Sequence, residues 1–308
     1  MNKKLATDLI EKFNSYFKKS QDNSVINIDK LLKKKIDFQI QNFSDAVKIY
    51  GGNIPPNRFS HYFVAIVMDG YGIKTVGLTE FQVKPNTLIF TGAHVIHSSR
   101  DYTQDTKGYI LSFSKDFLLV NHANKNYLED LSFFKISNQP FLYISDSEKE
   151  DLLILFQNIV AEYLNNNEHK EELIRLYIFE ILIKVERIYL RQFSSLHNVD
   201  SPQKLITEFK QIVEINFLSE KRVSFYGKAL SVHPNHLNAT IKKVTGKTCS
   251  EWIHERVILE AKCLLQTTNL SVKEISAYLS FEDSSYFSKY FKKLTDFTPL
   301  EYKETCRI

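Results

Sequence analysis

Cysteine is scarce in this 308-residue chain, which has only Cys249, Cys263 and Cys306, all in its last quarter. An odd set of widely spaced cysteines provides neither a disulfide framework nor the paired spacing of a zinc site. We therefore expect these residues to be reduced thiols of a cytoplasmic protein.

Long apolar runs and targeting signals are also missing. No stretch reaches the ~18 consecutive apolar residues that a membrane-spanning helix needs. The first twenty residues carry Asp8 and Glu11 and contain no long apolar segment, so they do not read as a signal peptide. These absences predict a cytoplasmic protein that does not contact a membrane.

Charge of one sign is in small excess, and that excess lies in the C-terminal third. The formal net charge is +4, and residues 201–308 hold 16 lysines and arginines against 12 acidic residues, so residues 1–200 are neutral. A local basic excess is what binding to the phosphate backbone of DNA requires. The chain is long enough for two domains, and the charge favours a DNA-binding role for the second.

The C-terminal third contains an internal repeat, carried by residues 224–246 and 272–296. Residues 229–231, Ala-Leu-Ser, recur 49 positions later as Tyr-Leu-Ser, and residues 241–243, Ile-Lys-Lys, recur 50 positions later as Phe-Lys-Lys. We expect the extra residue to lie in a turn, where an insertion is tolerated. Each copy reads as two apolar-faced helices with a tight turn between them, which is a helix-turn-helix unit.

Capping residues predict where the helices of the second copy begin. Ser271 and Glu274 form a capping box, and Asp283 or Ser284 can cap the helix that follows. Helical spacing predicts a buried face on that helix, made of Tyr286, Phe287, Tyr290, Phe291 and Leu294. In the first copy, a proline starts the corresponding helix, Leu237 and Ile241 point inward, and a long helix from about residue 250 to 267 joins the copies.

The outward faces of these two helices carry side chains suited to DNA. Asparagine pairs with adenine through two hydrogen bonds, threonine contacts the thymine methyl group, and lysine and small hydroxyl side chains suit base edges. Paired lysines one turn further on suit phosphates. We predict base contacts from Asn235, Asn238, Ala239, Thr240, Ser284, Ser285, Ser288 and Lys289, and phosphate contacts from Lys242, Lys243, Arg256, Lys292 and Lys293.

The stretch FEDSSYFSKYFKKLTDFTPLEYK, residues 281–303, resembles the signature of the DNA-binding domain of the AraC/XylS family of bacterial transcription regulators. Ser280 and Asp296 stand where the family commonly has glycine, although aspartate still tolerates a left-handed C-cap. By motif alignment with the family, the two outward faces correspond to its usual base-reading positions. Ala239 departs from the longer basic side chain common there, which limits it to apolar contact.

Several functional expectations follow from this resemblance alone. Two recognition helices on one spacer would enter successive major grooves of promoter DNA, about one turn apart. Most family members activate transcription by contacting RNA polymerase, so the resemblance implies an activator with RNA polymerase as a partner. Family members also often form dimers.

Residues 59–113 read as several short strands with close turn signals, which predict a small barrel or sandwich. Residues 81–97, FQVKPNTLIFTGAHVIH, and residues 108–118 resemble the cupin-type sensory domain at the N-terminus of many AraC-family members. We therefore expect an α+β protein, with a cupin-like β-barrel and flanking helices followed by an all-α domain of two helix-turn-helix units.

A barrel of this kind can hold a ligand if a few polar side chains point inward. The candidates for an effector site are Arg58, His61, Tyr62, His94 and His97, while a filled barrel with no ligand fits the sequence equally well. His97 stands where the second cupin motif places a metal-binding histidine. Because the histidine pair of the first motif is missing, we expect no metal, no cofactor and no enzyme activity. A cupin metalloenzyme with an accessory DNA-binding domain is the alternative.

Helical segments and a linker complete the prediction. Residues 4–18 form an amphipathic helix, and residues 147–164 and 171–193 form two longer helices with apolar stripes. Part of their apolar surface covers the barrel, and the rest either pairs with another subunit or is buried within the chain. Polar residues 194–203 form a linker between domains at 1–193 and 204–308. We expect a transcription regulator whose first domain senses a small molecule, forms a dimer, or does both; a ligand-independent regulator is a further alternative.

Overall fold

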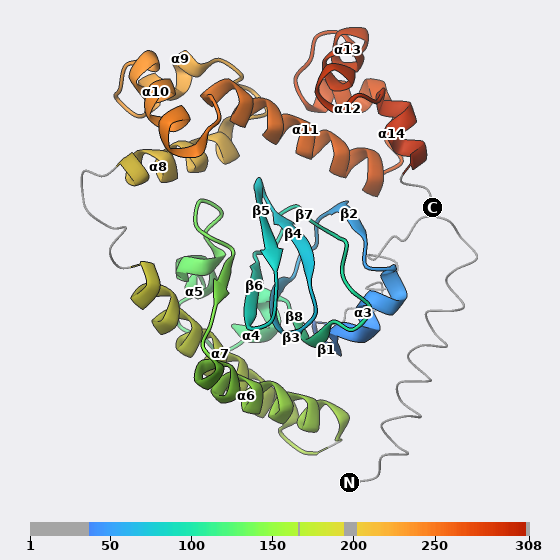
Figure 1. The fold of residues 1–308 in the computed structure, drawn as a ribbon, viewed down its shortest axis with the longest axis vertical. Coiled ribbons are helices and arrows are strands. Elements are labelled where there is room, and N and C mark those ends of the chain that lie inside the picture. The colour runs from blue at the N-terminus through green and yellow to red at the C-terminus, as the bar shows by residue number, and fades with distance from the viewer. Residues whose placement is uncertain (1–36, 166, 194–201, 306–308) are drawn as a thin grey trace.

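The computed structural model describes residues 37–165, 167–193 and 202–305. The helix expected at residues 4–18, most of the expected linker, and Cys306 lie outside the described residues. A β-rich domain with covering helices is followed by an all-helical domain that lies across one end of the sheets (Figure 1). No helix among the described residues is long and apolar enough to cross a membrane.

Two antiparallel sheets make up the first domain. The five-stranded sheet has the order β1-β8-β3-β6-β9, and the four-stranded sheet has the order β2-β7-β4-β5. The strands are β1 (Phe38–Asn42), β2 (Ile54–Asn57), β3 (Tyr62–Asp69), β4 (Gly72–Val76), β5 (Thr79–Val83), β6 (Thr87–Thr91), β7 (His97–Arg100), β8 (Lys107–Phe113) and β9 (Phe141–Tyr143). The strands expected between residues 59 and 113 are present, while β1, β2 and β9 were not predicted as strands.

The expected closed barrel is wrong, because the two sheets are stacked and their edge strands are not paired with each other. Val64 and Ile66 on β3 point to one side of the five-stranded sheet and pack against helices, whereas Ala65 and Val67 point to the other side and pack against the four-stranded sheet. The central sheet is therefore buried on both faces. Pro55 and Pro56 restrict β2 to an edge, because proline has no N–H to donate to a neighbouring strand.

The helices of the first domain are α3 (Phe43–Tyr50), α4 (Lys115–Leu118), α5 (Tyr127–Asp130), the 3-10 helix η1 (Ser132–Phe134), α6 (Asp146–Leu164) and α7 (Lys170–Phe193). Helix α3 packs Phe43 and Val47 into the core between the two sheets, and the other helices cover the outer face of the five-stranded sheet. Helix α6 begins with a capping box between Ser145 and Glu148. The two long helices expected from apolar periodicity are present, and their inner faces join the core of the sheet.

The second domain consists of α8 (Pro202–Asn216), α9 (Val223–Ala229), α10 (Pro234–Thr245), α11 (Cys249–Thr267), α12 (Val272–Tyr278), α13 (Ser284–Thr295) and α14 (Pro299–Thr305). Helices α9 and α12 are both seven residues long, and α10 and α13 are both twelve. Each turn passes through a left-handed serine, Ser231 or Ser280, with φ of 56°. The extra residue of the second copy falls between Ser280 and α13, so the predicted position of the insertion is confirmed.

Candidate nucleic-acid interface

Helix α10 is held in place by its caps and by its inner face. The imidazole Nδ1 of His233 accepts a hydrogen bond from the Asn235 N–H, and Gly246 ends the helix in the left-handed conformation with φ of 77°. Leu237 and Ile241 are fully buried. Because the buried side of α10 packs against the rest of the domain, its opposite side is exposed to solvent.

The residues of α10 that are predicted to contact bases differ in how exposed their side chains are. Asn235 and Ala239 are exposed, whereas Asn238 and Thr240 are half-buried. The side-chain oxygen of Asn238 accepts a hydrogen bond from the Cys249 N–H at 3.0 Å, which fixes the start of α11 against α10. This bond occupies one of the two acceptor positions of the Asn238 oxygen and restricts how its side chain can turn toward a base.

Helix α13 repeats this arrangement with different caps. The Asp283 carboxylate accepts the Tyr286 N–H at 2.8 Å, and this bond lowers the pKa of Asp283. Asp296 ends the helix in the left-handed conformation, as expected for its place after the recognition helix. Phe287 and Phe291 are fully buried.

The buried face of α13 is narrower than predicted. Tyr286 is 61% exposed and Leu294 is 44% exposed, so neither belongs to the core. Both lie beyond the stripe that Phe287 and Phe291 form, because the rest of the domain covers only one side of the helix. Tyr286 stands at the front of α13 and enlarges the surface available for binding.

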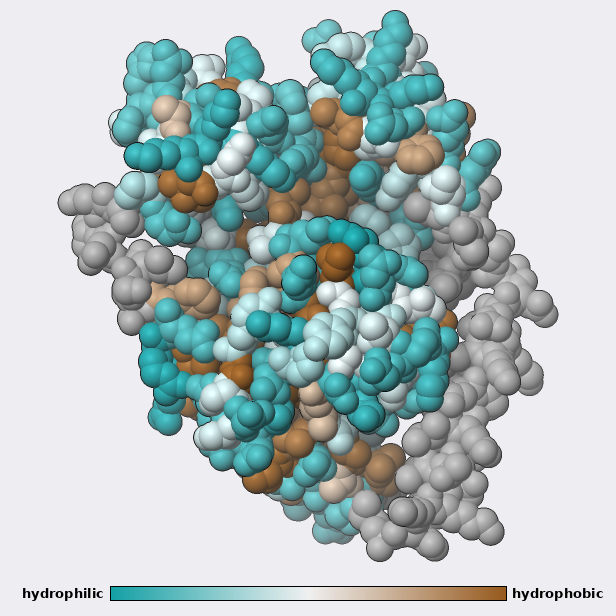
Figure 2. All heavy atoms as spheres, viewed as in Figure 1, coloured by the Kyte–Doolittle hydropathy of each residue, from teal (hydrophilic) through white to brown (hydrophobic). Residues whose placement is uncertain are grey.

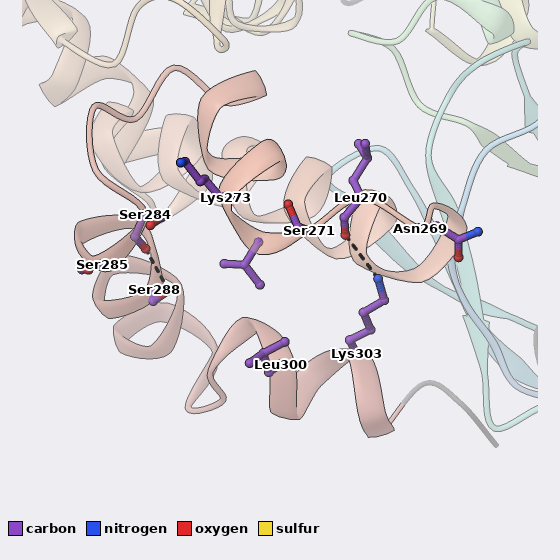
Figure 3. Close-up of a pocket in the computed structure, with 10 residues that line it drawn as sticks. Asn269, Leu270, Ser271, Lys273, Ser284, Ser285, Ser288, Leu300 and Lys303 are labelled. Carbon is purple, nitrogen blue, oxygen red and sulfur yellow. Dashed lines mark hydrogen bonds between the residues drawn. The ribbon is translucent and has the colours of Figure 1, made fainter.

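The remaining residues at the front of α13 border an open hollow of about 520 Å³, shown in Figure 3. Ser284, Ser285 and Ser288 line one side of it, and the start of α12 and helix α14 line the rest. The hydroxyl of Ser288 donates to the Ser284 carbonyl at 2.9 Å. Lys289 is exposed on the same helix. The three predicted hydroxyl side chains therefore border the hollow, and Lys289 is exposed one position after Ser288 without lining it.

The four lysines predicted to hold phosphates lie at equivalent places in the two units. Lys242 and Lys243 are exposed in the last turn of α10, and Lys292 and Lys293 are exposed in the last turn of α13. In Figure 1, α10 and α13 lie above α11 while the sheets lie below it. Both basic helix ends are thus clear of the first domain.

Arg256 does not belong to this surface, and its predicted phosphate contact is wrong. It is 8% exposed. Its guanidinium donates to Glu214 at 2.7 Å and to Glu260 at 3.0 Å, and it stacks 3.8 Å from the centroid of the Phe217 ring. These contacts hold the Arg256 side chain inside the domain, where it cannot reach a DNA phosphate.

The five residues predicted to line an effector pocket do not form one site. Arg58 leaves the first domain and pairs with Glu260 of α11 at 2.5 Å. The hydroxyl of Tyr62 donates to Glu129 near the covering helices. His94 is exposed, and His61 is half-buried beside Ser60. The backbone brings several of them close together, since the His94 N–H donates to the Phe59 carbonyl at 2.6 Å and the Phe59 ring lies 5.3 Å from the His97 ring, but their side chains have different partners.

His97 belongs to a buried polar cluster that the sequence analysis missed. Lys74 of β4 lies 3.2 Å from both His97 Nδ1 and Ser99 Oγ. Burial lowers the pKa of Lys74 to about 7, and burial together with the Lys74 charge lowers the pKa of His97. In the described part of the chain, His97 Nε2 and Asn57 Oδ1 have no hydrogen-bond partner. Alternation along β4 places Lys74 inward, which is the sequence signal that could have identified it.

No metal centre is evident where a cupin enzyme would have one. Among the described residues, no group of three or more His, Cys, Asp and Glu side chains is arranged to hold a metal ion. Cys249 and Cys263 are buried free thiols in the helical domain, and burial raises the pKa of both.

Comparison with known proteins agrees with this geometry. A helix-turn-helix domain family matches residues 226–305. The chain is 26% identical over 110 residues to an uncharacterised helix-turn-helix transcriptional regulator, YijO, of Escherichia coli, and covers 39% of that protein. It is 22% identical over 284 residues to the transcriptional activator RhaR of an Enterobacter species, covering 90% of this chain and 98% of RhaR.

A solved structure also matches the second domain. The C-terminal domain of the response regulator yesN from Fusobacterium nucleatum is 30% identical, with 31% of this chain and 93% of that chain covered and a TM-score of 0.30. The curated proteins that the chain matches are named as regulators of transcription and not as enzymes, and the helix-turn-helix domain of residues 226–305 is of the DNA-binding kind. Residues 226–305 thus belong to a helix-turn-helix domain family, and the chain is similar through most of its length to transcription regulators of the AraC/XylS type.

Proposed function

We propose that this protein is a dimeric transcription activator that reads promoter DNA with both α10 and α13. The observation that carries the proposal is the repetition of caps, buried residues and exposed lysines in two units of equal helix lengths. Two helices presented in the same way can enter successive major grooves, about one turn of DNA apart.

Binding to the DNA upstream of its own gene tests this proposal directly. The protein should bind that duplex more tightly than a scrambled duplex, and the affinity should fall steeply as salt rises. A protein with no preference between the two duplexes at any salt concentration would contradict the proposal.

Lys289→Ala should separate base reading from phosphate binding. If Lys289 contacts a base edge, its loss should weaken binding to the specific site by ~1–3 kcal/mol and leave binding to random DNA nearly unchanged. Fluorescence anisotropy with both duplexes measures the difference. Lys135→Ala, an exposed lysine in the first domain, is the control, and equal losses on both duplexes would reduce Lys289 to a phosphate contact.

The outer face of α7 supports the proposed dimer. Leu176, Ile183 and Leu190 are 63%, 44% and 43% exposed and stand seven residues apart. They form a straight apolar stripe opposite the buried face of the helix. Ile154 adds an exposed apolar side chain on the neighbouring α6. A stripe of this kind is self-complementary, so a second copy related by a twofold axis can cover it.

Leu176→Glu combined with Ile183→Glu should convert the dimer to a monomer. A twofold interface would lose four buried side chains at ~1.5 kcal/mol or more each, about 6 kcal/mol in all, which weakens association by about 10,000-fold. Sedimentation equilibrium measures the change. Ile215→Glu, at a side chain that is 78% exposed in the second domain, is the control; a dimer that survives the paired substitution would place the interface elsewhere.

We also propose that the first domain responds to a small-molecule effector held beside Lys74 and His97. The support is the buried lysine, which among the described residues has no carboxylate as a hydrogen-bond partner, together with the His97 nitrogen that has no partner there. Activation through RNA polymerase is the further part of the proposal and rests on likeness to RhaR, a protein named as an activator. A reporter gene behind the upstream DNA tests the sign of regulation.

A further inference from the structure

The two helix-turn-helix units touch each other directly through Lys221. This residue lies in the segment between α8 and α9, in the first unit. Its ammonium donates to the Leu218 carbonyl at 3.2 Å and to the Leu279 carbonyl, at the end of α12 in the second unit, at 2.8 Å. The same ammonium lies 4.8 Å from the centroid of the Phe281 ring. A lysine of one unit therefore caps a helix of the other, where a positive charge is favourable.

Folding of a single unit does not require this lysine. The position 49 residues later, equivalent in the second unit, is Leu270, which packs against the core of that unit. The unit thus folds with an apolar side chain at this place. The ammonium group of Lys221 therefore contributes to the contact between the two units, through its bond to Leu279.

Apolar side chains surround the lysine and belong to both cores. Leu218, Phe281 and Tyr290 each pack against the cores of both units. Tyr290 lies on α13 and also meets His254 of α11 edge-on, with ring centroids 5.4 Å apart. The contact therefore reaches the second recognition helix itself. Figure 2 shows apolar side chains gathered in the hollow between the two helical lobes.

A second link between the units has a mechanical consequence. Helix α11 alone is 19 residues long, or about 28 Å, and helices of such length bend. A single bending rod lets the two recognition helices change their angle and separation. The hydrogen bond from Lys221 to the Leu279 carbonyl joins the same two units at a second place and restricts this motion.

We propose that Lys221 is a positioning residue that fixes the angle and separation of α10 and α13, and so selects DNA with one spacing between half-sites. The inference rests on the proposed reading of DNA by both helices. Spacing matters because one base pair more rotates the second half-site by about 34° around the DNA axis, at ~10.5 base pairs per turn.

Lys221→Met tests the proposal, because methionine keeps most of the side-chain stem over Phe281 and loses the bond to Leu279. A preferred site is first selected from random duplexes with the wild-type protein. Binding is then measured on that site, on sites with one or two base pairs inserted or removed between the halves, and on each half alone. We expect a roughly tenfold loss on the preferred site, less than twofold change on single halves, and a flatter dependence on spacing. Lys221→Arg, which retains a donor, should restore the spacing preference.

Each outcome has a distinct meaning. A Lys221→Met variant that keeps the wild-type spacing profile overturns the assignment, as does an equal loss on single half-sites, which would indicate damage to the first unit. A wild-type protein indifferent to spacing would overturn both this inference and the proposed use of two recognition helices.

Discussion

Glu260→Ala should lower the free energy of unfolding of the helical domain by about 3 kcal/mol. The Glu260 carboxylate is 1% exposed and accepts hydrogen bonds from Arg256 of its own helix and from Arg58 of the first domain. Removal of one member of a buried ion pair leaves an uncompensated buried charge, which costs ~3–5 kcal/mol. Arg256 keeps Glu214 as a partner, so we expect the lower end of that range.

Urea unfolding followed by the fluorescence of Trp252 measures this change. Trp252 is the single tryptophan of the chain and packs in the core of the first helix-turn-helix unit. Glu255→Ala is the matched control, because Glu255 pairs with Lys247 on the surface of the same helix, and exposed pairs contribute less than ~1 kcal/mol. Equal losses for the two variants would mean that burial of Glu260 contributes nothing.

The same carboxylate links the domains, so a double-mutant cycle with Arg58→Ala measures their coupling. Arg58 is 31% exposed at its side chain, and screening by solvent makes its own loss smaller than that of Glu260. If the pair persists in solution, the double variant should be more stable than the sum of the single losses predicts. Strict additivity would show that the two domains separate in the free protein.

The helical domain could be predicted in detail because its signals are local. Ser271 and Glu274 form the expected capping box, and Asp283 rather than Ser284 caps α13. Each of these interactions spans three residues of sequence. The N–H of the left-handed Asp296 bonds to the Lys292 carbonyl, four residues before it. The repeat adds a second copy of some of these signals, such as the left-handed residue that ends each of α10 and α13.

Errors arose where partners are distant in the sequence. Arg256 lies on the buried stripe of α11, but its charge suggested the surface, because its partner Glu214 lies 42 residues before it; likewise Arg58 reaches Glu260 across 202 residues. No periodicity reveals such pairs. The sandwich was taken for a barrel for the same reason, since pairing of β1 with β8 depends on contacts between residues 38–42 and 109–113. These distant contacts also changed the proposed effector site. Arg58 is engaged by Glu260, and Lys74 lies beside His97 instead.

Replacement of Lys242, Lys243, Lys292 and Lys293 by glutamine should produce the largest loss of DNA affinity available in this chain. All four are exposed at the ends of the recognition helices. Each phosphate contact releases counterions and contributes about 0.9 to the slope of log K against log salt. Four contacts therefore contribute about 3.6, and their removal should lower affinity by roughly 1000-fold or more at ~0.1 M salt.

Comparison with other lysines separates contact from net charge. Glutamine at Lys48, Lys84, Lys107 and Lys135, all exposed in the first domain, removes the same charge and should leave the slope unchanged within about 1. An equal effect of both quadruple variants would mean that only the total charge matters. The pairs can also be replaced separately: each of Lys242/Lys243 and Lys292/Lys293 should account for half of the slope, because the two pairs lie at equivalent positions in the last turns of α10 and α13. A slope carried wholly by one pair would show that only one unit binds.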